Sequence, residues 1–103
     1  MRDETLLDNA PLKLETVLYA LSDPARLHIV RNLADKGALA CYAAVAGLDL
    51  PKSTQSHHYR ILREAGLIAQ RKEGVCFIST LRKTDIDKRF PGLLDAVLRN
   101  AGG

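Results

Sequence analysis

The sequence predicts one mainly α-helical domain, residues 1–103, with a small β-hairpin. Hydrophobic residues make up 47% of the chain but aromatic residues only 5%, which indicates a core of aliphatic side chains and alanine. Apolar residues recur at three- and four-residue steps through several stretches, as amphipathic helices require. One pair of β-prone stretches follows Gly66. These observations together favour helices that pack around a minor sheet element.

Two helices are expected in the first third of the chain. Apolar spacing predicts an amphipathic helix over Pro11–Ala20. Asp23 can cap a second helix, because its carboxylate can accept the free amide hydrogens of the next turn, and Pro24 suits the first helical position. This second helix should extend to about Asp35, and Gly37 provides a natural stop.

A pair of helices joined by a tight turn should follow. A short helix is expected over about Leu39–Ala46, and the residues Gly47–Pro51 have the turn chemistry to connect it to a polar helix. That polar helix lies within the run Leu50–Ile68, which is rich in Ser, Thr, His and Arg. Two helices with this connection form a helix-turn-helix.

The last third of the chain predicts a hairpin and a final helix. The β-prone stretches Leu67–Arg71 and Val75–Leu81 are separated by the turn residues Lys72–Gly74. Thr84–Asp87 looks like a cap region, and the final helix carries Leu93, Leu94, Val97 and Leu98 on one stripe. The order α-α-α-α-β-β-α describes a winged helix-turn-helix in which the hairpin is the wing.

Charge is distributed unevenly along the chain. The net charge is +3, but residues 51–83 hold seven Lys or Arg against two Glu, whereas residues 1–50 hold five Lys or Arg against seven Asp or Glu. Phosphate contacts need cations gathered on one surface, so this asymmetry indicates a polyanion-facing half. A solvated charged face would give the same counts, and charge alone does not separate the two interpretations.

The polar helix has two different faces. On a helical wheel, one side carries residues that can pack and the other carries residues that can reach a nucleic-acid groove. The packing side holds Gln55, His58, Tyr59, Leu62 and Ala65, and the other side holds Ser53, Ser56, His57, Arg60 and Glu64. Adjacent helix positions point about 100° apart. His57 should therefore face outward and His58 inward.

The chain resembles the ArsR/SmtB family of bacterial winged helix-turn-helix repressors between about Leu18 and Leu98. The resemblance rests on three motifs: Ala20–Leu27, Lys52–His58 and Leu62–Ile68, which read ALSDPARL, KSTQSHH and LREAGLI. It implies a homodimer that binds double-stranded DNA at a palindromic operator. It also implies that a metal, metalloid or redox signal changes the affinity for that operator.

The candidate DNA-binding residues lie on the polar helix and on the wing. The resemblance places DNA contacts at Lys52, Ser53, Thr54, Ser56 and His57. Physical chemistry agrees, because hydroxyls can meet base edges or phosphates, and Lys52 and Arg60 can neutralise phosphate charge. Gln55 stands where the family usually has an apolar residue, and it can either loosen the packing or reach a neighbouring base. Arg71 and Lys72 can reach phosphates or the minor groove from the wing. In the alternative interpretation, Ser53 and Ser56 only cap a helix start and the arginine side chains are merely solvated.

The effector is not defined by the sequence. Cys41 lacks the second cysteine of the arsenic-type site of the family, and the last helix offers Asp95 but no histidine for the zinc-type site, so we expect no metal and no cofactor. Cys41 and Cys76 should be reduced thiols. They are candidate sensor thiols, although two ordinary small apolar side chains are the favoured interpretation.

Three classes of function compete. A dimeric transcriptional repressor is favoured, with the terminal helices as the dimer interface, because their apolar stripes exceed what so small a domain can cover. A winged-helix module that binds protein instead of DNA is the alternative. An enzyme is disfavoured, because no nucleophile has an adjacent base and no phosphate loop is present. No apolar run approaches the roughly 20 residues of a membrane span, and no signal peptide is visible, so we expect a cytoplasmic protein.

Overall fold

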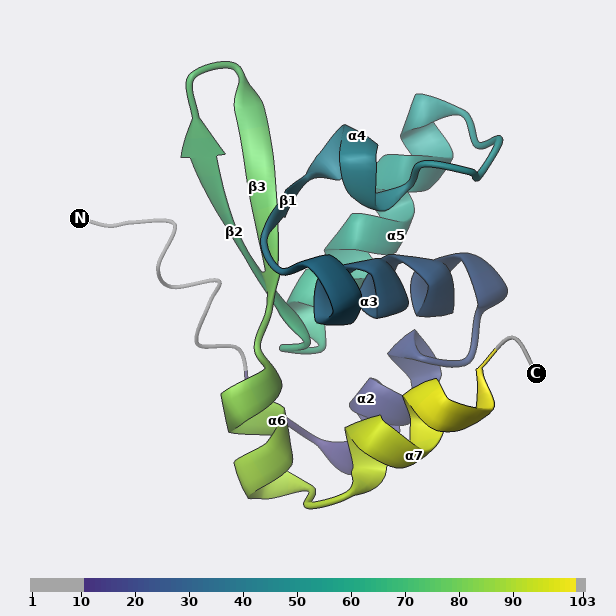
Figure 1. The fold of residues 1–103 in the computed structure, drawn as a ribbon, viewed down its shortest axis with the longest axis vertical. Helices are drawn as coiled ribbons and strands as arrows, with labels where there is room; N and C mark the ends of the chain where they lie inside the picture. Colours follow the sequence, from purple (N-terminus) through teal and green to yellow (C-terminus); the bar gives the residue numbers. More distant parts are fainter. Residues whose placement is uncertain (1–10, 102–103) are drawn as a thin grey trace.

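A computed structural model describes residues 11–101, and it confirms a mainly helical winged-helix fold. The ends of the predicted domain, residues 1–10 and 102–103, lie outside the described residues. The helices and strands, labelled as in Figure 1, are α2 Leu14–Ala20, α3 Pro24–Lys36, β1 Leu39–Ala40, α4 Cys41–Ala44, α5 Lys52–Glu64, β2 Ile68–Glu73, β3 Cys76–Leu81, α6 Lys83–Arg89 and α7 Leu93–Asn100.

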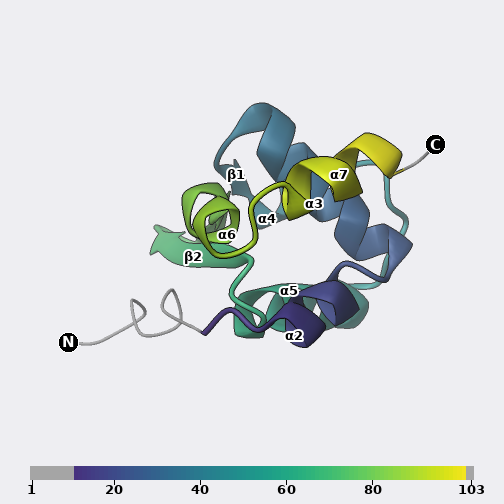
Figure 2. The ribbon, with the colours of Figure 1, turned by 90° about the horizontal axis from the view of Figure 1, so that it is seen from below.

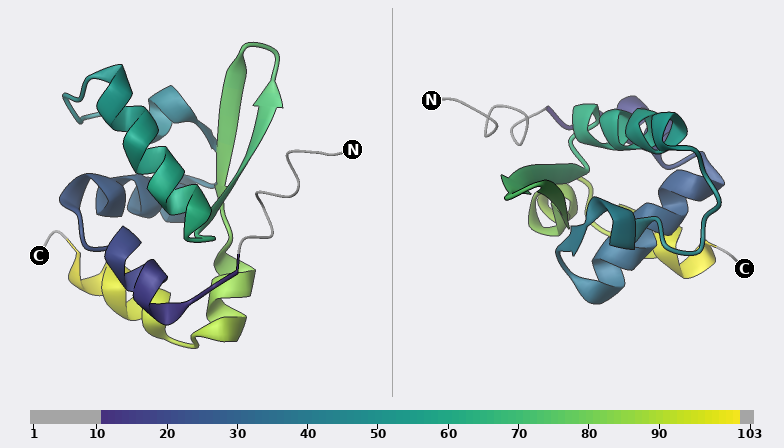
Figure 3. Two further views of the ribbon diagram at one scale, coloured as in Figure 1. Left: turned by 180° about the vertical axis from the view of Figure 1, so that it is seen from behind. Right: turned by 90° about the horizontal axis from the view of Figure 1, so that it is seen from above.

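The hairpin of β2 and β3 extends away from the helices, and α5 runs beside its base (Figures 1 and 3). The sheet is antiparallel with the strand order β1-β3-β2. In the hairpin, Gln70 pairs with Ser79 and Lys72 with Phe77. Since alternate residues of a strand point to the same face, Gln70, Lys72, Ser79 and Phe77 share one face of the wing.

The core lies where α3 meets α5, the sheet and the terminal helices. Aliphatic side chains from α2, α3, α5, β2, α6, α7 and the α5–β2 connection are fully buried there: Val17, Ile29, Val30, Leu62, Leu67, Ile68, Ile86 and Leu94. Asp23 begins α3 as predicted, because its carboxylate accepts hydrogen bonds from the amides of Ala25 at 2.8 Å and Arg26 at 3.2 Å. Gly37 ends α3 with a φ of +82°, a conformation that favours glycine.

The terminal helices lie at the end of the molecule opposite the hairpin tip (Figure 1). Viewed from below in Figure 2, α2 lies against α5 and α7 against α3. Four apolar residues recur here at three- and four-residue steps: Val17 and Leu21 are buried, but Leu14 and Leu18 are each 45% exposed. None of the helices in residues 11–101 is long and apolar enough to cross a membrane.

Two expectations about the first half of the chain were wrong in detail. The helix predicted over Pro11–Ala20 begins at Leu14, three residues later than predicted, and residues 11–13 are not helical. The predicted short helix over Leu39–Ala46 is reduced to α4, because Leu39 and Ala40 form a strand that pairs with Ser79 and Ile78. The small sheet therefore has three strands instead of two.

The second half also departs from expectation in two places. The strands continue to Glu73 and resume at Cys76, so the turn consists of Gly74 and Val75, with Gly74 at a φ of +62°. The region around Thr84 is a helix, α6, and not only a cap. Ile86 anchors α6 in the core, and Lys83 pairs with Asp87 one turn later at 2.6 Å.

Candidate nucleic-acid interface

The outer face of α5 presents free polar groups. Ser53, Ser56, His57 and Arg60 are exposed, as the wheel predicts. The residue preceding the helix is Pro51, and no side chain caps the helix start. Within residues 11–101, the hydroxyls of Ser53 and Ser56 make no hydrogen bond, so their interpretation as helix caps is wrong. Both hydroxyls are available to an external partner.

The inner face of α5 is fixed to α3 through a buried polar contact. His58 is 8% exposed, and its Nδ1 accepts a hydrogen bond from Nη1 of Arg26 at 3.1 Å. Arg26 also donates to the carbonyls of Ala20 at 2.7 Å and Tyr19 at 3.3 Å. Burial lowers the pKa of His58, and the charge of Arg26 acts in the same direction against the opposing effect of Asp23. The inward orientation of His58 is confirmed.

Tyr59 connects the two helices of the helix-turn-helix. Its hydroxyl donates to the carbonyl of Cys41 at the start of α4, at 2.5 Å. Burial, together with the neighbouring Cys41, raises the pKa of Tyr59 above its usual range, so the phenol stays protonated as a donor. Gln55 completes the turn, since its Nε2 donates to the carbonyl of Leu50 at 2.8 Å. Two hydrogen bonds thus fix the orientation of α5 relative to α4, one from Gln55 at the turn and one from Tyr59 in the middle of the helix.

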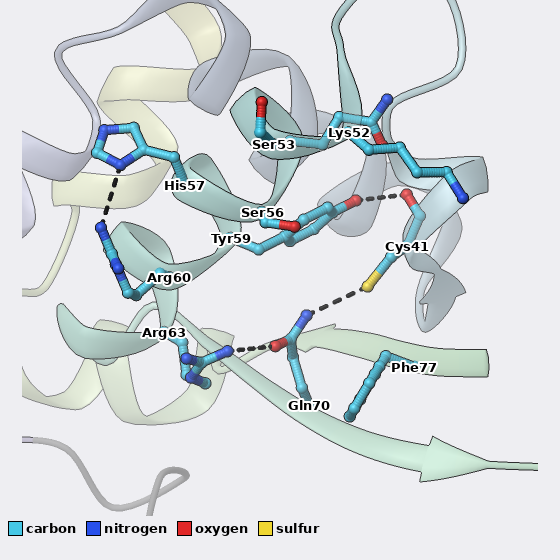
Figure 4. A pocket seen from close by; sticks show the side chains of 11 residues that line it. Cys41, Lys52, Ser53, Ser56, His57, Tyr59, Arg60, Arg63, Gln70 and Phe77 are labelled. Carbon is cyan, nitrogen blue, oxygen red and sulfur yellow. Dashed lines mark hydrogen bonds between the residues drawn. The ribbon is translucent and has the colours of Figure 1, made fainter. Parts of the chain in front are cut away.

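The wing is attached to α5 by a side-chain network (Figure 4). Arg63, in the last turn of α5, donates from Nη1 to Oε1 of Gln70 on β2 at 2.8 Å. The Nε2 of Gln70 donates to Oγ of the buried Ser79 at 3.0 Å and to Sγ of Cys41 at 3.2 Å. One glutamine therefore joins α5, α4 and both hairpin strands.

Residues of α4, α5 and the wing line an open pocket, here called the hollow, with a volume of about 520 Å³ (Figure 4). Its lining consists of hydroxyl, cationic, amide and thiol groups with one aromatic ring: Cys41, Lys52, Ser53, Gln55, Ser56, His57, Tyr59, Arg60, Arg63, Gln70 and Phe77. The structure thus brings together six of the nine predicted DNA-binding residues. Thr54, Arg71 and Lys72 do not line the hollow.

Sequence reasoning missed Arg63, Gln70 and Phe77 as parts of this surface. The sequence does contain a signal for Arg63. It follows Ser56 by seven residues, or two helical turns, and therefore lies on nearly the same face of the predicted helix. Gln70 and Phe77 had none, because their direction depends on the pairing of β2 with β3.

The two predicted cations of the wing point in opposite directions. Lys72 is exposed and pairs with Phe77 on the wing face that turns toward α5. Arg71 pairs with Ile78 on the other face, where its guanidinium forms a 2.9 Å salt bridge with Glu73. Lys72 and Arg71 therefore cannot be expected to contact DNA in the same way, because they lie on different faces of the wing.

Both cysteines are free thiols. The Sγ of Cys41 accepts the bond from Gln70 and lies 3.4 Å from Oγ of Ser79, whereas Cys76 begins β3 near the wing tip. Within residues 11–101, no group of three or more His, Cys, Asp or Glu side chains is arranged to hold a metal ion.

An exposed polar helix of a helix-turn-helix, beside a wing and a cationic hollow, defines a winged-helix DNA-binding protein. Comparison with known sequences and structures agrees with this class. A helix-turn-helix domain family matches residues 21–71. The helix-turn-helix-type transcriptional regulator YceK of Bacillus subtilis is 37% identical over 82 residues, which cover 79% of this chain and 82% of that protein.

The chain is also similar to regulators from other organisms. The regulator MJ1325 of Methanocaldococcus jannaschii is 39% identical over 60% of this chain and 70% of its own length, and a homolog of the cadmium resistance regulatory protein CadC of Staphylococcus aureus is 38% identical over 62% of this chain and 53% of its own length. The repressor BigR of Xylella fastidiosa has the same fold, with a TM-score of 0.61 at 21% identity over 75% of this chain and 85% of its own. The chain belongs to the ArsR-type family of helix-turn-helix transcriptional regulators, and it is a DNA-binding regulator of transcription.

Proposed function

We propose that the protein is a cytoplasmic repressor that binds a palindromic operator as a homodimer, with α5 in the major groove of each half-site. The observation that carries this proposal is the outer face of α5. On this face the hydroxyls of Ser53 and Ser56, which have no partner among residues 11–101, lie near the exposed cations Lys52 and Arg60. Hydroxyls and cations contact base edges and phosphates, while His58, Tyr59 and Arg63 fix the helix from within. We expect no catalytic activity.

The exposed apolar residues of α2 support the homodimer. Leu14 and Leu18 are each 45% exposed and Tyr19 is 60% exposed. Leu93, Val97 and Leu98 of α7 are only partly buried at the same end of the molecule. A second copy of the chain that covers this end would place two α5 helices in a two-fold arrangement, which suits a palindrome with half-sites about one DNA turn apart.

The dimer can be tested separately from DNA binding. Sedimentation equilibrium of the full chain should give twice the chain mass, and Leu18→Glu should shift the population to monomer. Tyr42→Glu is the matched control, since Tyr42 is 71% exposed on α4, away from the terminal helices. A monomeric wild type, or equal effects of the two substitutions, would contradict this interface.

DNA binding is tested by fluorescence anisotropy with the upstream DNA of the protein's own gene and with a scrambled duplex across a salt series. Between 50 and 200 mM salt, six to ten phosphate contacts should weaken binding by about 10³- to 10⁵-fold. Ser56→Ala with His57→Ala should remove the preference for the upstream DNA. Lys88→Ala, an exposed cation on α6, should leave it intact. Equal, salt-insensitive binding to both duplexes would instead favour the protein-binding module.

A response to a signal can be examined in the same titration. Of the two candidate sensor thiols, Cys41 has direct contacts with the network that joins α5 to the wing, so oxidation at its Sγ would act on the bond from Gln70. Oxidised wild type should lose DNA affinity and oxidised Cys41→Ser should keep it. The same loss in both proteins would assign the response to Cys76 or to no thiol.

A further inference from the structure

Arg60 and His57 form a contact on the outer face of α5 in which the guanidinium is the donor and the imidazole the acceptor. Nη2 of Arg60 lies 3.4 Å from Nδ1 of His57 (Figure 4). A guanidinium carries only donors, so Nδ1 of His57 must be the acceptor in this contact. While this contact is made, Nε2 of His57 is the ring nitrogen left to donate a hydrogen bond to a partner. Both side chains consequently offer hydrogen-bond donors, and no acceptor, to a partner in front of the helix.

We infer that His57 and Arg60 read a guanine in the major groove of each operator half-site, an inference that rests on the proposed DNA-binding function. In the major groove, guanine presents two neighbouring acceptors, N7 and O6. Adenine presents an acceptor beside a donor, thymine an acceptor beside a methyl group, and cytosine a donor. A pair of donors is therefore matched fully by guanine alone.

The rest of the helix face agrees with this assignment. Base contacts of a helix-turn-helix come mainly from the N-terminal part of its second helix, and His57 is the sixth residue of α5. Glu64, the exposed carboxylate on this side, is the last residue of the helix, two turns beyond His57. Gln55, which could pair with adenine, has its amide bonded to Leu50.

Arg60 has the freedom that such a contact needs. Within residues 11–101, its guanidinium makes no hydrogen bond or ion pair other than the contact with His57. The remaining N–H groups can therefore turn toward O6 and N7. Lys52, at the start of α5, and Lys72, on the wing, are both exposed and are left for phosphates, and phosphate contacts carry no sequence information.

The test begins with selection of duplexes from a random library on the immobilised full-length protein. Each guanine of the enriched half-site is then replaced in turn by 7-deazaguanine, which keeps Watson–Crick pairing but lacks the N7 acceptor. In anisotropy titrations, we expect one guanine per half-site at which the replacement weakens binding about fivefold or more. In Arg60→Ala and His57→Ala, which remove exposed side chains, that replacement should have a clearly smaller effect.

Two further variants make the test specific. Arg60→Lys keeps the charge but loses the fork of donors, so it should bind the enriched site with reduced discrimination among bases at that position. Lys72→Ala should weaken binding to the natural and the 7-deazaguanine duplexes by the same factor.

The possible failures are distinguishable. If no duplex is enriched, the proposed DNA-binding function fails. If a site is enriched but no 7-deazaguanine replacement weakens binding, or if the replacement acts equally on wild type and both alanine variants, the inference about guanine is overturned while DNA binding stands.

Discussion

The opposite orientation of the two wing cations leads to a quantitative prediction about salt dependence. Lys72 lies on the wing face that turns toward α5 and has no acidic neighbour across the strand pair, where it faces Phe77. Arg71 lies on the other face and is already paired with Glu73 at 2.9 Å. We therefore expect Lys72, and not Arg71, to contact a phosphate when α5 enters the groove.

The expected magnitude follows from counterion release. Each phosphate contact contributes about 0.9 to the slope of log affinity against log salt, so loss of Lys72 from both subunits of a dimer should flatten the slope by about 1.8. Over a fourfold rise in salt, wild type should then lose about 12-fold more affinity than Lys72→Ala. The measurement is an anisotropy titration at several salt concentrations between 50 and 200 mM.

The control removes the other wing pair without changing net charge. Arg71→Ala combined with Glu73→Ala should leave the slope at the wild-type value. It should also leave stability nearly unchanged, because both side chains are more than half exposed and such pairs contribute about 0–1 kcal/mol. The reasoning is refuted if the double variant flattens the slope as Lys72→Ala does, or if Lys72→Ala does not flatten it.

Local chemistry accounts for the parts of the fold that the sequence predicts well. Asp23 and Pro24 determine where α3 begins, and Gly37 where it ends, through contacts within one turn. The helical period similarly separates the buried His58 from the exposed His57. In each case the residues that decide the structure are neighbours in the chain, so the pattern is visible without knowledge of the fold.

The parts that were missed depend on distant partners. Leu39 and Ala40 form a strand only because β3 lies beside them, and a two-residue strand has no period of its own. In α6 a single residue, Ile86, is buried, which is too little to produce an amphipathic pattern. The contribution of Gln70 to the candidate site likewise depends on the register that pairs it with Ser79. Each of these features required the three-dimensional structure.

The remaining predictions concern stability, measured by urea unfolding. Leu62→Ala, at a fully buried core position, should lower the free energy of unfolding by about 2–5 kcal/mol, whereas Val75→Ala, at a side chain 96% exposed, should not. Gln70→Leu should lower it by about 1–3 kcal/mol, because Nη1 of Arg63 loses its acceptor and the buried hydroxyl of Ser79 keeps only its contact with Cys41; an unchanged midpoint would contradict the network. Stability should also fall as the pH falls below the ordinary His58 pKa of 6.5. Folding lowers this pKa, so between 6.5 and the folded value the unfolded chain binds a proton that the folded chain does not, and acid therefore favours unfolding. His58→Gln, which can still accept from Arg26, should lose this part of the pH dependence. An identical loss of stability with acid in the variant would show that the buried imidazole beside Arg26 is not its source.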